Sequence, residues 1–184
     1  MTKVNVNLGE NYDKDLITVI LTDVGGAIAE KSLKDKIQKA INADSLTISV
    51  SNGIRDGLIA YFYINTVNSI DENPQYISEV RLEKLRITST TSGIYTTINT
   101  RAIITDRGTA KTVWENTESA NIPIGDVIFD FTNNKYISTA KGVINAVRLM
   151  QMSEEELRAS INIAAGEAGK RQCDQLREDI ANND

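Results

Sequence analysis

The sequence predicts an α+β fold: a mostly antiparallel sheet of about five or six strands with helices packed on one face, two of them C-terminal. Two observations support this. Short β-branched or alternating segments separated by turn residues fill most of the first two thirds of the chain. A helical period of 3.6 residues dominates the segment from about residue 134 to residue 180. No repeat or linker divides the 184 residues, so we expect one domain over residues 1–184.

The N-terminal half is predicted to contain one helix among strands. Leu16–Leu21 is short and apolar, as in a buried strand, and an apolar residue every fourth position predicts a helix over 27–41 with Asn42 as its C-cap. Alternation predicts a strand over Ser45–Val50. Both parities are apolar over Leu58–Val67, which predicts a strand in the middle of the sheet. The intervening turn signals are Asn52-Gly53 and Asp56-Gly57.

The next segments are predicted to form long strands. Apolar residues of Tyr76–Thr88 change from even to odd positions, and one extra residue near Glu83-Lys84, a β-bulge, would keep them on one face. Over residues 94–104 the even positions form the inner face, and threonine suits such a half-buried surface. Asp106-Arg107-Gly108 predicts a hairpin turn in which the glycine has the positive φ, and residues 112–118 return as the next strand.

The last third is predicted to be helical after a short apolar run over residues 127–131. One helix covers residues 137–150, and the second begins at a capping box formed by Ser153 and Glu156. Small residues, Gly169 among them, lie on one side of the second helix. Because glycine is unfavourable inside a helix, we expect another element to approach closely there, either the protein's own sheet or a second subunit.

Composition excludes several classes of chemistry. The formal net charge of −5 argues against a nucleic-acid partner. The chain has no histidine and one cysteine, Cys173, which excludes histidine-based catalysis, an internal disulfide and most transition-metal sites. We therefore expect no catalytic residues, no metal and no cofactor, and the absence of a run of 18 apolar residues predicts no transmembrane segment.

One group of residues is a candidate binding site. Trp114, the only tryptophan, is predicted on an outer hairpin strand, with Tyr95 and Arg101 near it. Aromatic residues and arginine are enriched at the energetic centres of protein interfaces. The alternative is that Trp114 is half-buried and simply covers the sheet.

The order of elements resembles small bacterial cell-envelope lipoprotein domains. The local matches are DGLIAYFYI (Asp56–Ile64), read as a strand, and ITDRGTAKTVWE (Ile104–Glu115), read as the end of a long hairpin. The resemblance implies a non-catalytic role in envelope assembly, transport or secretion. It also implies a periplasmic or outer-membrane-associated location if the chain is a trimmed mature form, and a cytoplasmic one otherwise.

The leading functional hypothesis is therefore a non-catalytic binding or assembly module of a bacterial cell envelope, with a protein partner or a homo-oligomer. A carrier of a small apolar ligand, held between the sheet and the helices, is the alternative. An enzyme that works without histidine is the third hypothesis.

Overall fold

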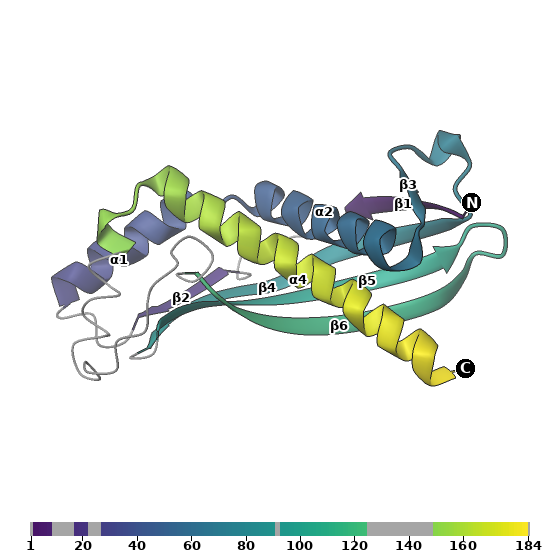
Figure 1. Cartoon of the computed structure of the whole chain (residues 1–184). Coiled ribbons are helices and arrows are strands. Elements are labelled where there is room, and N and C mark those ends of the chain that lie inside the picture. Colours follow the sequence, from purple (N-terminus) through teal and green to yellow (C-terminus); the bar gives the residue numbers. More distant parts are fainter. Residues whose placement is uncertain (1, 9–16, 22–26, 91–92, 125–148, 184) are drawn as a thin grey trace.

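The computed structural model describes residues 2–8, 17–21, 27–90, 93–124 and 149–183, and these form a mixed sheet with helices on one face (Figure 1). The strands are β1 (Lys3–Leu8), β2 (Ile17–Leu21), β3 (Asn65–Val67), β4 (Tyr76–Thr90), β5 (Gly93–Asp106) and β6 (Lys111–Pro123). The helices are α1 (Ala27–Ala40), α2 (Ala43–Phe62), the short 3-10 helix η1 (Ile70–Glu72) and α4 (Glu154–Asn183).

Strand β4 organises the sheet. The strand order is β3-β1-β4-β5-β6, and β2 also pairs with β4. Strands β1 and β2 lie along successive parts of the same edge of β4 and run parallel to it, while β5 and β6 follow as antiparallel neighbours. The α+β class is confirmed, but the sheet is mixed rather than mostly antiparallel. Parallel pairing arises here because the chain between β2 and β4 passes through helices before it returns to the sheet.

The predicted bulge in β4 is confirmed. The register between β4 and β5 shifts between Leu82 and Lys84, which leaves Glu83 as the extra residue. Leu82 and Leu85 are only 3% and 0% exposed, so both stay on the inner face despite their opposite parity. The predicted inner face of β5 is also confirmed, because the even positions from 94 to 102 are buried and the odd positions are not.

The two strands predicted over Ser45–Val50 and Leu58–Val67 are wrong. Residues 43–62 form helix α2, and only 65–67 are a short edge strand. The buried residues of α2 include Leu46, Val50 and Ile54, which recur every four positions, as on a helix face. Within the six residues Ser45–Val50, a helical period of about four positions cannot be distinguished from the alternation of a strand. The predicted turn glycines lie inside the helix, where they serve close packing.

Two local predictions about turns are also wrong. Asn42 is the N-cap of α2, because its side chain accepts a hydrogen bond from the Ser45 amide at 2.9 Å. In the β5–β6 hairpin the positive φ of 55° belongs to Ala110 rather than Gly108. The Asp106 carboxylate stabilises this turn by accepting bonds from the Thr109 amide and hydroxyl, and these bonds hold the pKa of Asp106 below its usual value.

The second predicted C-terminal helix is confirmed as α4. Its capping box is present: Ser153 Oγ accepts from the Glu156 amide at 3.1 Å, and the Glu156 carboxylate accepts from the Ser153 amide at 2.6 Å. The predicted run over 127–131 lies outside the described residues, and so does the predicted helix over 137–150 except at residues 149 and 150.

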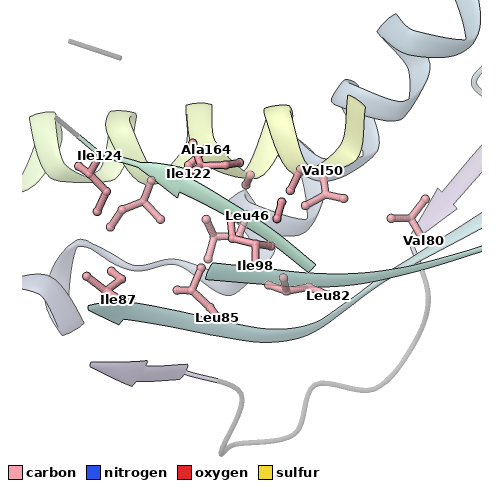
Figure 2. Close-up of a cluster of buried hydrophobic side chains, with 14 of the residues drawn as sticks. Leu46, Val50, Val80, Leu82, Leu85, Ile87, Ile98, Ile122, Ile124 and Ala164 are labelled. Atoms are coloured by element: carbon pink, nitrogen blue, oxygen red, sulfur yellow. The ribbon is translucent and has the colours of Figure 1, made fainter. Parts of the chain in front are cut away.

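The core lies between the sheet and the helices α2 and α4 (Figure 2). Leu46 and Val50 of α2 and Ala164 of α4 meet side chains from three strands there. The strand residues labelled in this cluster are Val80, Leu82, Leu85, Ile87, Ile98 and Ile122, and Ile124 follows the end of β6. Helices α2 and α4 therefore cover one face of the sheet and leave the opposite face uncovered.

Helices α2 and α4 pack side by side at close range. A Cβ atom on Gly53 would lie 1.9 Å from the Gly166 carbonyl oxygen, and one on Gly169 would lie 2.1 Å from that of Val50. Gly57 faces the side chain of Cys173 in the same way. The close approach expected at Gly169 is therefore present, and its partner is helix α2 of the same chain, rather than the sheet or a second subunit.

Tyr63 ends helix α2 in an unusual conformation. Its φ is 53°, in the left-handed region that side chains with a Cβ adopt at a cost of about 1–2 kcal/mol, and its side chain is 79% exposed. We expect Tyr63→Gly to raise the free energy of unfolding by about 0.5–1 kcal/mol, measured by urea denaturation. Tyr63→Ala is the control, because it removes the ring and keeps the Cβ. An equal gain in both variants would contradict the backbone explanation.

Candidate functional site

The face of the sheet turned away from the helices is the candidate site. It is formed by the residues of β4, β5 and β6 whose parity is opposite to that of the core, and we call it the outer face. None of its side chains is buried. Its members include Glu79, Arg81, Lys84, Arg86, Tyr95, Thr97, Asn99, Arg101, Ile103, Glu115, Thr117, Ser119 and Asn121.

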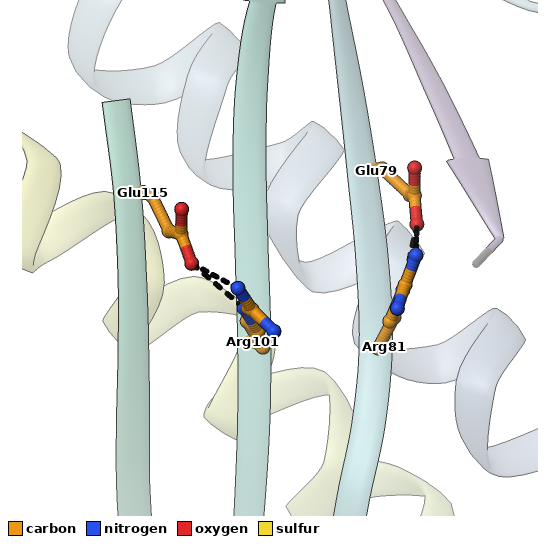
Figure 3. A network of polar contacts seen from close by, with 4 residues as sticks. All are labelled: Glu79, Arg81, Arg101 and Glu115. Carbon is orange, nitrogen blue, oxygen red and sulfur yellow. Dashed lines mark hydrogen bonds and ion pairs between the residues drawn. The ribbon is translucent and has the colours of Figure 1, made fainter. Parts of the chain in front are cut away.

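Two ion pairs lie on the outer face in front of the strands, with the helices behind them (Figure 3). Arg81 Nε donates to Glu79 Oε1 at 2.6 Å, and Arg101 Nε donates to Glu115 Oε1 at 2.8 Å. The Glu115 carboxylate raises the pKa of Arg101, because it accepts hydrogen bonds from the guanidinium and attracts its charge. All four side chains are between 37% and 44% exposed, so each pair is accessible to a partner.

Hydroxyl and amide groups continue the polar surface toward the other end of the strands. Thr97 Oγ1 donates to Asn121 Oδ1 at 3.3 Å, and Ser119 Oγ donates to Asn99 Oδ1 at 2.9 Å. Each bond joins β5 to β6 across the outer face. The hydroxyl-rich sequence is thus divided between the two faces: Thr96 and Thr100 are buried under the helices, and their odd-numbered neighbours form this surface.

The three residues predicted to form a binding site are not brought together. Tyr95 and Arg101 both lie on the outer face, but six positions apart along β5. Trp114 is opposite Ile104 on the inner face, where its Nε1 donates to Asp179 Oδ2 of α4 at 2.9 Å. This hydrogen bond, together with one from Gln175, lowers the pKa of Asp179. Trp114 therefore joins β6 to α4.

Sequence reasoning missed the carboxylates and the second arginine of the outer face. Glu79 and Arg81 have the parity opposite to the buried positions of β4, so alternation already placed them outside. Their neighbours on β5 and β6 depend on the register between strands, which alternation alone does not determine. The pairing of Glu115 with Arg101 follows from that register.

The one thiol of the chain, Cys173, lies in the described structure and is buried. Burial raises the pKa of the Cys173 thiol to about 12, and its sulfur donates to the Ile54 carbonyl oxygen at 3.3 Å. A thiolate, the reactive form, is therefore scarce at neutral pH. No group of three or more histidine, cysteine, aspartate or glutamate residues in the described part of the chain is arranged to hold a metal ion.

A shallow open groove of about 340 Å³ lies on the solvent side of the helix layer, between α2 and α4. Gly53 and Gly166 line it together with polar side chains such as Asn52, Asn162 and Lys170. The groove follows from the close packing of the two helices. Among the described residues, no helix is both long enough and apolar enough to cross a membrane.

Comparison with known proteins finds matches among solved structures at low identity and low TM-scores. No protein-family model matches the chain, and neither does any curated protein. A PelC dodecamer from Paraburkholderia phytofirmans is 14% identical, with 80% of this chain and 85% of that chain covered and a TM-score of 0.35. A protein from Xanthomonas campestris of the family DUF330 is also 14% identical, with 95% and 88% covered and a TM-score of 0.37.

A lipoprotein from Neisseria meningitidis is 9% identical, with 82% of this chain and 97% of that chain covered and a TM-score of 0.33. No residue role is transferred from these proteins.

Proposed function

We propose that the chain is a non-catalytic binding or assembly module and that a protein partner packs on its outer face. The observation that supports this most directly is that many side chains of that face are held in place by contacts with one another. Four of its charged side chains are already paired, and four of its hydroxyl and amide side chains are already hydrogen-bonded, although they are partly exposed. Side chains held in place before binding lose less conformational entropy when a partner arrives.

The composition of the outer face also suits a protein partner. It presents arginine and one tyrosine beside small polar residues, and arginine and aromatic residues are enriched at protein interfaces. Arg81 and Arg101 each stand beside a carboxylate, so covering these two pairs would bury neutral pairs rather than single charges. Lys84 and Arg86 add positive charge beside the pairs and favour a partner surface that carries carboxylates.

The proposal of a non-catalytic role is supported by the state of the titratable groups. The chain has no histidine, and its one thiol is buried. Among the described residues, the carboxylates whose pKa is lowered are Asp106 and Asp179, and they make structural hydrogen bonds to a turn and to Trp114. These contacts account for both shifts without a catalytic role.

The hypothesis of a small apolar ligand between the sheet and the helices gains no support from the described core. Side chains such as Val50, Leu85 and Ile98, each 0% exposed, fill the space between these layers. The bacterial cell envelope remains the setting that the sequence resemblance implies. Fractionation of the cells that produce the protein tests that part of the proposal.

The binding role is tested with a photo-crosslinking amino acid placed at Thr117, which is exposed on the outer face, and at Ile163, which is exposed on α4. Irradiation of the producing cells should give a discrete protein adduct from position 117. Position 163 is the matched control on the helix layer. Adducts from position 163 alone would place the binding surface on the helices and contradict the proposal.

A further inference from the structure

Strand β6 forms one edge of the sheet, because no described strand pairs with its far side (Figure 1). The Ile124 amide donates to the Ile94 carbonyl oxygen at 2.9 Å, and the register between β5 and β6 is constant from there to Ile104. Because hydrogen-bonded pairs alternate along an antiparallel ladder, the even residues of β6 bond to β5 and the odd residues face the edge. The N–H and C=O groups at the edge are those of Glu115, Thr117, Ser119 and Asn121.

The accessible part of this edge is short and bounded at both ends. Val113 is an extra residue, because the register shifts there, and a bulge of this kind disturbs pairing with a further strand. Pro123 has no N–H and bounds the other end. Residues 115–121, which we call the open edge, contain no lysine or proline, the residues that often prevent pairing at an edge. At about 3.3 Å per residue the open edge is about 23 Å long.

Helix α4 contacts β6 on the helix side of the sheet and leaves the open edge accessible. Its hydrogen bonds to β6 join Asp179 to Trp114 and Gln172 to Asn116, and both β6 residues are even. The odd residues of the open edge have exposed side chains on the outer face. An extended segment can therefore approach β6 in the plane of the sheet.

The open edge is acidic. It carries Glu115 on the outer face and Glu118 on the helix side. Glu115 pairs with Arg101, whereas Glu118 is half-buried and has no hydrogen bond or ion pair with another described residue. Pairing of β6 with β6 of a second copy would double these negative charges along one edge, which opposes association. A lysine or arginine opposite Glu118 would instead supply the missing partner.

We infer that the open edge of β6 binds an extended, basic segment of a partner protein as a further antiparallel strand. Backbone hydrogen bonds supply the attraction in this mode of recognition, and alternate side chains decide which segment binds. The segment has a lysine or arginine opposite Glu118 and an apolar residue opposite Ala120, which is buried. This inference goes beyond the proposed packing on the outer face, because it uses backbone groups at the edge.

A fluorescent synthetic peptide, Thr-Val-Thr-Lys-Thr-Val-Lys, is the probe. In antiparallel register its first residue lies opposite Asn121 and its last opposite Glu115, so the central lysine faces Glu118. Fluorescence anisotropy with the full chain should give a Kd of about 10–500 μM. The same peptide with N-methyl groups on its third and fifth residues should bind at least about tenfold more weakly, because methylation removes the N–H donors that face β6 and keeps the side chains.

Variants of the chain test the edge from the other side. Thr117→Pro should weaken peptide binding by about tenfold or more, because the N–H that it removes faces the edge rather than β5. Thr117→Val is the matched control, since it keeps the N–H and should bind within about twofold of the wild type. Glu118→Lys should weaken binding by about fivefold or more, because it places lysine opposite lysine. Circular dichroism verifies folding, and Ser119→Pro replaces Thr117→Pro if the latter unfolds.

The inference is overturned if the wild-type chain does not bind the peptide at concentrations up to about 1 mM. Equal binding of the N-methylated peptide would also contradict it, as would a folded Thr117→Pro chain that binds the peptide as tightly as the wild type. If the chain instead dimerises in sedimentation velocity, Thr117→Pro abolishes the dimer and the peptide does not bind, a second copy occupies the edge and the basic segment is wrong.

The two proposals fail in different ways. If the peptide does not bind while position 117 crosslinks to another protein in cells, the strand addition is wrong and the binding role stands. If the peptide binds and position 117 gives no adduct, the edge binds an extended segment and the packing of a partner on the outer face is wrong. If neither is observed, both are wrong.

Discussion

Replacing Gly169 by alanine is expected to lower the free energy of unfolding by about 2–3 kcal/mol. A Cβ at this position would lie 2.1 Å from the Val50 carbonyl oxygen and 2.9 Å from its carbon. Both atoms belong to the backbone of α2, so no side-chain rotation relieves the overlap and the two helices must separate. Gly169→Leu is expected to cost more, because it adds three further carbons to the same filled space. Denaturation in urea measures both changes.

Gly166→Ala is the matched control in the same helix. Its Cβ would lie 3.6 Å from the Ser49 carbonyl oxygen, an ordinary contact distance. Alanine is the better helix former by up to about 1 kcal/mol, so this variant should be neutral or more stable. Equal losses in the free energy of unfolding for Gly166→Ala and Gly169→Ala would contradict the explanation that a close backbone contact at Gly169 causes the loss. A more stable Gly169→Ala protein would show that α2 and α4 are not in close contact.

Gln172 is expected to give the second large effect. Its side chain is 1% exposed, and its Nε2 donates to the carbonyl oxygen of Thr100 at 2.9 Å and to the hydroxyl at 2.8 Å. Its Oε1 accepts from Asn116 Nδ2 at 3.0 Å. Gln172→Ala removes these bonds and leaves a cavity between α4 and the sheet. We expect a loss of about 2–4 kcal/mol in the free energy of unfolding.

Two further variants separate the causes. Gln172→Leu keeps most of the volume and removes only the hydrogen bonds, so its cost should be smaller, about 1–3 kcal/mol. Gln175→Ala, one turn further along α4, removes a hydrogen bond from a half-buried side chain to Asp179 and should cost less than about 1 kcal/mol. If Gln172→Leu were as stable as the wild type, the buried polar contacts would contribute nothing to stability.

The features that the sequence predicts well depend on neighbouring residues alone. The parity change in β4 indicated the bulge at Glu83, because a strand with one buried face must keep its apolar residues on that face. The inner positions of β5 follow from the same rule. The capping box at Ser153 and Glu156 was found because both partners lie within one helical turn.

The features that the sequence does not reveal depend on distant segments. Gly53 and Gly57 resemble turn residues in the sequence, which is why strands were predicted where helix α2 lies. These glycines occur in a helix because they contact α4, which lies more than a hundred positions later in the chain. The parallel pairing of β1 and β2 with β4 was also not predicted, because it joins segments that are distant in the sequence. On the outer face, alternation placed Arg101 outside, but its pairing with Glu115 required the register between β5 and β6.

The position of α4 in the chain has a consequence for biosynthesis. This helix emerges from the ribosome after the six described strands, yet it covers part of the core face that β5 and β6 present. Until it is complete, apolar side chains of that face such as Ile98 and Ile122 lack part of their cover. A nascent chain or a truncated product that stops before residue 154 therefore exposes apolar, aggregation-prone surface and is a substrate for chaperones and proteases. This exposure ends when α4 packs on the sheet.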